Sequence, residues 1–446
     1  MPTIPKPKHP TAWSMYRWLR EPYPYLDELH AEYGDTFRME LFGLKFVVFS
    51  NPDDVRDVFT DDGSELLGGE FNKTLSALLG DRSVLMADGK DHRRKRKLLL
   101  PPFHGERMQA YGQTMLDVSD DLIDQMPHDE SFALHAPMQD ITLRVIVQTV
   151  FGFSGAKLEE MVRQTKKLLE LGAWAPLLIP AMQFDLGRFS PYGRFKLAAA
   201  EADRLLFRNI DEKRASKQRG ADILSLLLDA RDEDGDPMSN EELRDELVTL
   251  LVAGHETTAT GLTWAMRWLI ENPEVLAELR EELHALGPDP GPETLAKAPF
   301  LDGVVREALR LVPIIPLVGR VLAKDRTIGG YHLKAGSNLT CSIYLAHRRP
   351  EAYPDPLRFD PRRFIGKKLT PQEFMPFGGG VRRCIGMQFA LYEMKMVLAR
   401  LVTRCDFAFD EKVSRGMERR SITITPANGL RVFLKRRRLR PSLAAA

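Results

Sequence analysis

The sequence has few of the features that would suit an oxidising compartment or a membrane. It has three cysteines among 446 residues, too few for a disulfide framework in a chain of this size. Its longest uncharged stretch, Leu171 to Phe184, contains two prolines and is too short to span a bilayer. The first ten residues carry prolines where a signal peptide or anchor would have an apolar run. We therefore expect a cytoplasmic protein without a membrane anchor.

An excess of one charge is also missing. The chain has 63 Lys and Arg residues against 62 Asp and Glu residues, so its formal net charge is +1 and we expect no nucleic-acid partner. Basic residues nevertheless gather at residues 90–97 and from Lys435 to Arg440. We interpret the second group as part of a solvated, disordered tail over residues 435–446.

Spacers between domains are absent as well. The sequence has no Ser/Gly-rich or Pro-rich linker and no internal repeat. With 43% hydrophobic residues and a mean hydropathy of -0.27, the chain can bury a large core and hold a cofactor inside it. We therefore expect one domain over residues 1–446, with residues 1–20 as an N-terminal extension.

The patterns that the sequence does contain are mostly those of helices. A long apolar-periodic segment runs from Asn240 to Glu271, where Asn272-Pro273 ends it. Further helices are predicted over residues 53–59, 301–311, 385–403 and much of 104–217, and strands over 44–49 and 339–343. Near the end, residues 421–425 and 430–434 flank Asn428-Gly429, which predicts a closing β-hairpin. The expected fold class is mainly α with a small β-rich portion.

A loop near the C-terminal end carries the strongest chemical signal. Cys384 lies within Phe377 to Gly386, a segment that also contains Gly378 and Arg382. Glycines let a backbone approach a flat macrocycle closely, and an arginine offers a fixed cation to a haem propionate. Backbone amides near a sulfur temper its charge. The loop therefore has the setting that a thiolate ligand to haem iron requires.

The usual alternative for a lone cysteine is a buried apolar residue. We accept that interpretation for Cys341, which lies in a predicted strand, and for Cys405, which follows a predicted helix.

The cysteine loop resembles the haem-binding loop of the cytochrome P450 superfamily, and other segments from about Tyr33 to Lys435 match that superfamily in order. The resemblance implies the cytochrome P450 fold, with haem b buried between the long central helix and the cysteine loop. It makes Cys384 the axial ligand to the iron. It also implies that Phe377, Gly378, Arg382 and Gly386 bind the cofactor.

The central helix carries a second signature, Ala-Gly-His-Glu-Thr-Thr over residues 253–258. Helical spacing places Ala253 and Thr257 on one face, and a threonine hydroxyl can bond to the carbonyl four residues earlier and bend the helix. Taken alone, the hexapeptide also suits a helix whose polar residues face solvent. The resemblance implies a groove over the haem, lined by Ala253, in which Glu256 and Thr257 relay protons during dioxygen cleavage.

A third signature combines Glu307 and Arg310 with a later segment that contains Arg363. Residues three apart on a helix are neighbours, so the first two form a pair that is weak evidence by itself. The resemblance implies that all three form a buried network beneath the haem loop. Their expected role is structural, in haem incorporation.

The basic cluster at residues 90–97 matches a helix that binds haem propionates in the superfamily. His92 and Arg96 share a helical face, and each is a sensible anion ligand. Arg320 matches another propionate-binding arginine. An exposed histidine without a role remains the alternative for His92.

Substrate-pocket residues follow from the resemblance, and almost all are apolar, which indicates a lipophilic small-molecule substrate. The predicted set is Val84, Leu85, Met86, Val252, Ala253, Thr257, Thr258, Ile315, Leu317, Ile422 and Thr423. Any of these side chains could instead belong to the core. Residues 171–192 resemble a lid over the access channel, and Trp174, Leu177, Leu178 and Phe184 are its apolar candidates.

The remaining cations, Arg93, Arg94, Lys97 and Arg383, are expected on the cysteine side of the haem, where an electron donor docks. A positive surface attracts acidic partners, so we expect a ferredoxin or flavodoxin with its own reductase. We expect the protein to be a monomer.

The sequence thus predicts a haem-thiolate monooxygenase that inserts one oxygen atom from dioxygen into a fatty acid or a terpenoid or steroid-like molecule. Two alternatives remain. One is a peroxide-driven peroxygenase or isomerase with the same fold, and the other is a non-catalytic haem protein that binds gas.

Overall fold

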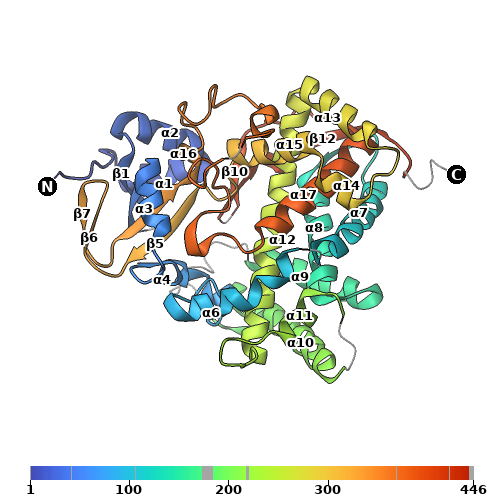
Figure 1. Ribbon diagram of the computed structural model, residues 1–446, viewed down its shortest axis with the longest axis horizontal. Coiled ribbons are helices and arrows are strands. Elements are labelled where there is room, and N and C mark those ends of the chain that lie inside the picture. The colour runs from blue at the N-terminus through green and yellow to red at the C-terminus, as the bar shows by residue number, and fades with distance from the viewer. Residues whose placement is uncertain are drawn as a thin grey trace.

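The computed structural model describes residues 2–41, 43–105, 107–172, 184–216, 220–367, 369–420 and 422–440. A five-stranded sheet and the N-terminal helices occupy one side of the molecule, and most of the other helices occupy the opposite side (Figure 1). The helices are α1 (Thr11–Arg20), α2 (Pro22–Tyr33), α3 (Pro52–Thr60), α4 (Gly68–Asn72), α5 (Ser76–Leu79), α6 (Gly89–Leu99), α7 (Arg107–Gln125), α8 (His135–Phe151), α9 (Gly155–Gly172), α10 (Pro191–Ala215), α11 (Ile223–Asp229), α12 (Asn240–Glu271), α13 (Pro273–Ala285), α14 (Pro292–Ala296), α15 (Pro299–Leu311), α16 (Ile343–Ala346) and α17 (Met387–Arg404). This is the mainly α fold that the sequence predicts.

The largest sheet has the strand order β1-β2-β8-β5-β3, with β2 and β8 parallel and the other pairs antiparallel. Its strands are β1 (Thr36–Leu41), β2 (Leu44–Phe49), β3 (Leu66–Leu67), β5 (Leu317–Leu322) and β8 (Asn338–Ser342). Within the described residues, three small sheets contain β4 (Ser131–Ala133), β9 (Cys405–Phe409) and β12 (Arg431–Arg437); β10 (Met417–Arg420) and β11 (Thr423–Pro426); and β6 (Arg326–Ile328) and β7 (Tyr331–Leu333).

Helix α12 passes through the middle of the molecule and packs against α8, α15, α17 and β11 (Figure 1). Its start is fixed by a capping box, in which the Ser239 side chain accepts from the Glu242 amide and the Glu242 carboxylate accepts from the Ser239 amide. Its end is fixed by Pro273, which begins α13. The predicted limits of this helix are therefore confirmed.

The predicted closing hairpin is wrong. Asn428 and Gly429 do form a tight turn, with φ of 56° and 65°. However, β11 pairs with β10, whereas β12 pairs with β4 and β9. The turn therefore carries the chain from one sheet to another, because the partner strands come from earlier parts of the sequence.

The prediction of a disordered basic tail is wrong for residues 435–440. Strand β12 continues to Arg437, whose guanidinium donates to the carbonyl of Asp124 at 2.7 Å. Arg440 forms an ion pair with Asp124 at 2.5 Å and another with Asp121 at 2.8 Å. The basic residues are thus held by carboxylates and carbonyls at the end of α7.

Among the helices that the structure describes, none combines the length and the apolar character needed to cross a bilayer.

Candidate active site

The loop before α17 presents Cys384 through a closed set of backbone hydrogen bonds. The Cys384 amide donates to the Phe377 carbonyl at 3.0 Å, and the Arg383 amide donates to Gly380 at 3.1 Å. Helix α17 begins three residues after the cysteine, at Met387. Among the three cysteines, Cys384 has an exposed side chain whereas Cys341 and Cys405 are buried. The fold thus displays one thiol at the N-terminal end of a long helix, where the positive end of the helix dipole favours a thiolate.

Electrostatics separates Cys384 from the two buried thiols. Desolvation by surrounding protein atoms raises the pKa of Cys384, while the Gly386 amide, Arg96 and Arg383 oppose that rise. Burial raises the pKa of Cys341 and of Cys405 to about 12. The interpretation of these two residues as apolar core is confirmed, because both are buried and remain neutral thiols.

Two glycines of the cysteine loop are needed for close packing against α3. A Cβ atom at Gly379 would lie 2.4 Å from the Phe59 ring, and one at Gly380 would lie 1.7 Å from the Phe59 carbonyl oxygen. These glycines therefore let the loop pack against the end of α3. Gly378 is needed for its φ of 68°, since a Cβ there would meet no atom within 4 Å.

Three arginines and one histidine lie near the loop, with one carboxylate among them. His92 and Arg320 are buried, and Arg96 and Arg382 are half-buried. Arg382 donates to Asp88 at 2.5 Å, and its Nε atom is buried without a hydrogen-bond partner. The structure shows no carboxylate within ion-pair distance of His92, Arg96 or Arg320 in the described residues.

The pKa values of His92 and Arg320 are both lowered at this site. Burial, together with repulsion from Arg382 and Arg96, lowers the pKa of His92 to about 4. Burial also lowers the pKa of Arg320 to about 10, again with Arg382 contributing. Cations buried together need an anion that the chain does not supply. Haem propionates fit this requirement, and the alternative of an exposed histidine at position 92 is excluded.

The middle of α12 has an exposed position at the place where the groove is predicted. The Thr257 hydroxyl donates to the Ala253 carbonyl at 2.6 Å, and Ala253 is exposed although most of this helix is buried. Gly254 allows close packing against α8, because a Cβ there would lie 2.4 Å from the Ile146 Cδ1 atom. The polar signature therefore combines an open face at Ala253 and Thr257 with a tightly packed glycine beside it.

Glu256 faces α8, and two side chains that the sequence did not indicate hold it there. Gln139 donates to Glu256 Oε2 at 2.6 Å, and His135 Nε2 lies 3.2 Å from Oε1. Burial raises the pKa of Glu256, but these hydrogen bonds and the charge of His135 outweigh it, so the net pKa is lowered. Nothing in the spacing of His135 or Gln139 pointed to this contact, since each lies more than 100 residues from Glu256.

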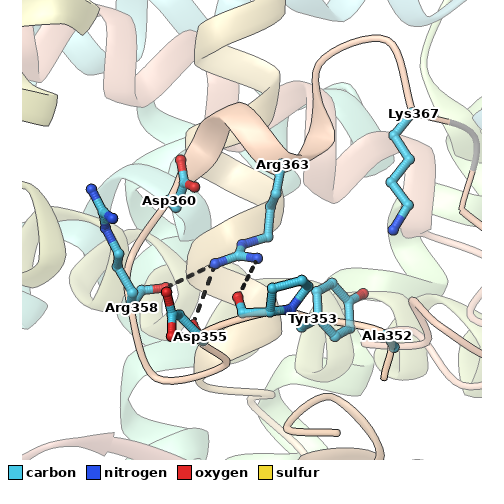
Figure 2. Close-up of a pocket in the computed structure, with 8 residues that line it drawn as sticks. Ala352, Tyr353, Asp355, Arg358, Asp360, Arg363 and Lys367 are labelled. Atoms are coloured by element: carbon cyan, nitrogen blue, oxygen red, sulfur yellow. Dashed lines mark hydrogen bonds between the residues drawn. The ribbon is translucent and has the colours of Figure 1, made fainter. Parts of the chain in front are cut away.

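The predicted network of Glu307, Arg310 and Arg363 is present. Arg310 donates to both carboxylate oxygens of Glu307 at 2.6 and 2.8 Å, and Arg363 donates to Oε1 at 3.0 Å. Arg363 also donates to the carbonyl of Pro354 at 3.1 Å. Figure 2 shows its further hydrogen bonds to the carbonyls of Asp355 and Arg358. The ring of Tyr353 lies beneath this network, 4.7 Å from the Arg310 guanidinium carbon. Tyr353 was not predicted, because a lone tyrosine carries no spacing signal.

The cations expected to form a docking surface are largely paired within the chain. Arg94 contacts Asp232 at 2.6 Å and Glu242 at 2.9 Å, so it holds the start of α12. Lys97 pairs with Glu233, and Arg93 lies 3.5 Å from Asp62. Arg383 is exposed and has no ion pair among the described residues. The expected role of Arg94 on a partner-facing surface is therefore wrong, since its charge is used internally.

The predicted pocket residues differ in exposure. Val84, Thr258 and Thr423 are buried; Leu85, Met86, Val252, Thr257, Ile315 and Leu317 are half-buried; Ala253 and Ile422 are exposed. Of the predicted lid residues, Trp174, Leu177 and Leu178 lie outside the described residues, and Phe184 is 67% exposed.

Comparison with known proteins identifies the family. The Cytochrome P450 family model matches residues 2–431. The chain is 36% identical over 423 residues to the putative cytochrome P450 135B1 of Mycobacterium tuberculosis, covering 94% of this chain and 88% of that protein. It is 35% identical over 409 residues to the putative cytochrome P450 138 of the same species, covering 91% and 90%. The chain belongs to the cytochrome P450 family.

Two solved structures agree with this assignment. Cyanobacterial CYP120A1 with retinoic acid bound matches with a TM-score of 0.85 and 26% identity over 97% of this chain and 99% of that one. The haem domain of cytochrome P450DA has a TM-score of 0.86 and 24% identity, covers 98% of both chains, and shows the fold alone. The protein is therefore a cytochrome P450 monooxygenase, an oxidoreductase that uses haem iron with a cysteine thiolate ligand, a small-molecule substrate and a redox partner.

Proposed function

We propose that this monooxygenase inserts one oxygen atom from dioxygen into a C–H or C=C bond of a lipophilic molecule, either a fatty acid or a terpenoid or steroid-like compound. The observation that carries the proposal is the character of the predicted pocket. None of its residues is charged, and Leu85, Met86, Val252, Ile315 and Leu317 all remain half-buried. Apolar side chains that keep exposed area are suited to cover an apolar ligand.

The solved relative with 26% identity supports the same substrate class. It binds retinoic acid, a molecule with an apolar body and one carboxylate. An apolar pocket recognises such a ligand through the burial of its hydrocarbon part, at about 25 cal/mol for each Å² removed from water.

Haem ligated by Cys384 supplies the dioxygen chemistry when it is bound. The chain's own contribution is to hold the cofactor and to place protons. Arg96 and Arg320 bind the propionates as cations without a carboxylate partner, Arg382 binds them through its unpartnered Nε atom, and His92 binds them as a neutral hydrogen-bond donor. Thr257 donates its proton to Ala253 at 2.6 Å, so the oxygen of its hydroxyl can accept a hydrogen bond from water in the groove. Glu256 is the adjacent acid that supplies protons to this water.

A ligand titration tests the substrate class. A C16 fatty acid, retinoic acid and a steroid are added to the ferric protein while the Soret band is recorded. We expect a saturable shift to the high-spin spectrum with at least one of them, as an apolar ligand displaces water. A matched polar control, such as a sugar of similar size, is expected to cause no shift. A shift with the polar control and none with the apolar compounds would contradict the proposal.

Electrons are proposed to come from a separate acidic ferredoxin or flavodoxin that docks near Cys384. Since Arg94 is paired internally, Arg383 is the cation that best supports this docking. A positive surface accelerates association with an acidic partner and makes the rate sensitive to salt. We expect Arg383→Gln to raise the KM for ferredoxin several-fold, whereas Arg20→Gln on α1 leaves it unchanged. Turnover that stays flat as ionic strength rises would contradict this docking.

A further inference from the structure

The contact between α8 and α12 contains a buried histidine that the haem-binding machinery does not use. His135 is the first residue of α8 and its side chain is 2% exposed. Its Nδ1 atom lies 3.1 Å from Thr263 Oγ1, and its Nε2 atom lies 3.2 Å from Glu256 Oε1. Gly429 packs beside it, since a Cβ there would lie 3.4 Å from the His135 Cβ. The ring therefore has two polar partners and a fixed position.

The hydrogen-bond directions determine where the protons lie. The Thr263 hydroxyl donates its single proton to the Ala259 carbonyl at 2.7 Å, so it can only accept from His135. His135 Nδ1 must then carry a proton. In a neutral ring, Nε2 would be an acceptor that faces the carboxylate of Glu256, which is also an acceptor. The 3.2 Å contact therefore needs one further proton, held either by His135 Nε2 or by Glu256 Oε1.

The neighbouring side chains favour a proton that is held between His135 and Glu256. Gln139 donates to Glu256 Oε2 at 2.6 Å, which stabilises the carboxylate and with it the imidazolium form of His135. The neighbouring His255 is occupied by Thr142 at 3.0 Å, and burial lowers the pKa of His255 to about 4, so it stays neutral. Beyond it, Asp140 of α8 pairs with Lys166 of α9 at 2.5 Å.

Glu256 links the buried ring to a more open region. The Glu256 side chain is 25% exposed, whereas His135 is closed off, and Thr257 follows Glu256 directly on the open face of α12. Glu256 can therefore exchange protons with water, whereas His135 can exchange them only through Glu256.

We propose that His135 is a positioning and proton-holding residue for Glu256, and that the pair keeps one transferable proton beside the groove at Thr257. This inference rests on the proposed role of Glu256 as the distal acid. To deliver the proton, the Nε2–H bond of His135 breaks and an O–H bond forms at Glu256 Oε1, which leaves His135 as the neutral Nδ1–H tautomer. That O–H bond then breaks as Glu256 passes the proton to water in the groove, and a proton from water at the exposed edge of Glu256 restores the pair.

The first test needs no turnover. Histidine side-chain NMR at pH 7 reports whether His135 Nε2 carries a proton in the reduced, carbon monoxide-bound protein. We expect the Nε2–H signal of the wild type to be lost in Glu256→Gln, because the variant removes the carboxylate that accepts this hydrogen bond. An Nε2–H signal that is unchanged in Glu256→Gln would overturn the inference.

The second test measures product formed per dioxygen consumed between pH 6 and 9. We expect this coupling in the wild type to decline at alkaline pH as the pair loses its proton. In His135→Gln the decline is expected at least one pH unit lower, because Glu256 must then hold the proton alone. His255→Gln is the matched control, a buried histidine one residue from Glu256, and is expected to keep the wild-type profile. A wild-type profile in His135→Gln would overturn the inference.

The two tests separate this inference from the proposed function. If Glu256→Gln lowers the coupling but His135→Gln leaves its pH profile unchanged, the role of Glu256 stands and that of His135 is overturned. If the Nε2–H signal of His135 is lost in Glu256→Gln as expected but this variant retains full coupling, the pair exists and the proposed role of Glu256 in proton supply fails.

Discussion

Arg310 holds Glu307 through two parallel hydrogen bonds of 2.6 and 2.8 Å, and both side chains are fully buried. Arg362, which directly precedes Arg363 in the sequence, pairs with Glu278 at the surface. The two pairs share their chemistry and differ in burial, so they give a matched comparison.

The first prediction uses this comparison. Glu307→Gln leaves the buried charges of Arg310 and Arg363 without a carboxylate, so we expect the free energy of unfolding to fall by about 3–5 kcal/mol. Glu278→Gln removes the partner of an exposed arginine and is expected to cost about 1 kcal/mol or less. Urea unfolding of the holoprotein measures both. Equal losses in the two variants would contradict the assignment of the buried network.

The second prediction concerns Thr257. Thr257→Ala removes the hydroxyl beside Ala253, so we expect product per dioxygen consumed to fall about tenfold or more while peroxide is released. Thr149→Ala on α8 is the control, because its hydroxyl bonds the Val145 carbonyl at 2.8 Å in the same way, outside the groove. Full coupling in Thr257→Ala would instead favour the peroxide-driven alternative.

The third prediction concerns the cations left without carboxylate partners. Arg320→Gln removes a buried charge that the propionates are proposed to neutralise, so we expect haem transfer to apomyoglobin to become about tenfold faster. Arg326→Gln is the control, because Arg326 is already paired with Asp57 at 2.7 Å. The assignment would be wrong if both variants lost haem at the wild-type rate.

The fourth prediction concerns pH. His347 accepts a hydrogen bond from the Met375 amide at 2.9 Å, and burial lowers its pKa to about 3. The folded state therefore keeps His347 neutral, whereas the unfolded chain binds a proton below its ordinary pKa of about 6.5. The stability due to this residue is complete above pH 6.5 and is lost as the pH falls toward 3.

Urea unfolding at pH 4.5, 5.5 and 6.5 measures this effect. We expect the wild-type free energy of unfolding to rise with pH, and His347→Asn to reduce the slope by about 1 kcal/mol per pH unit. His128→Asn, at an exposed histidine, is expected to leave the slope unchanged. A slope that is the same in all three proteins would show that His347 is not held neutral.

Local signals predicted much of the fold. The limits of α12 followed from its apolar period and from Asn272-Pro273, and β2, α15 and α17 followed from similar short-range patterns. The partners of β11 and β12 could not be predicted, because strand pairing depends on segments far away in the chain. The Asn428-Gly429 turn was predicted correctly, but the pairing of the strands on either side of it was not.

In the candidate active site, too, short-range contacts could be predicted and long-range contacts could not. Thr257 and Ala253, or Glu307 and Arg310, are one turn apart, so helical spacing alone brings each pair together. The contact of His135 with Glu256 and the capture of Arg94 by Glu242 join distant segments and became visible only in the structure. Tertiary packing therefore decides which charged side chains remain unpaired, and this could not be predicted from the sequence.

The central claim is that Cys384 is the thiolate ligand of the haem. The most direct measurement is the absorption difference spectrum of the dithionite-reduced protein on addition of carbon monoxide, for the wild type, Cys384→His, Cys341→Ala and Cys405→Ala. We expect a strongly red-shifted Soret band that is lost in Cys384→His and kept in the other two variants. A shorter-wavelength band in the wild type, or a red-shifted band that survives in Cys384→His, would contradict the claim.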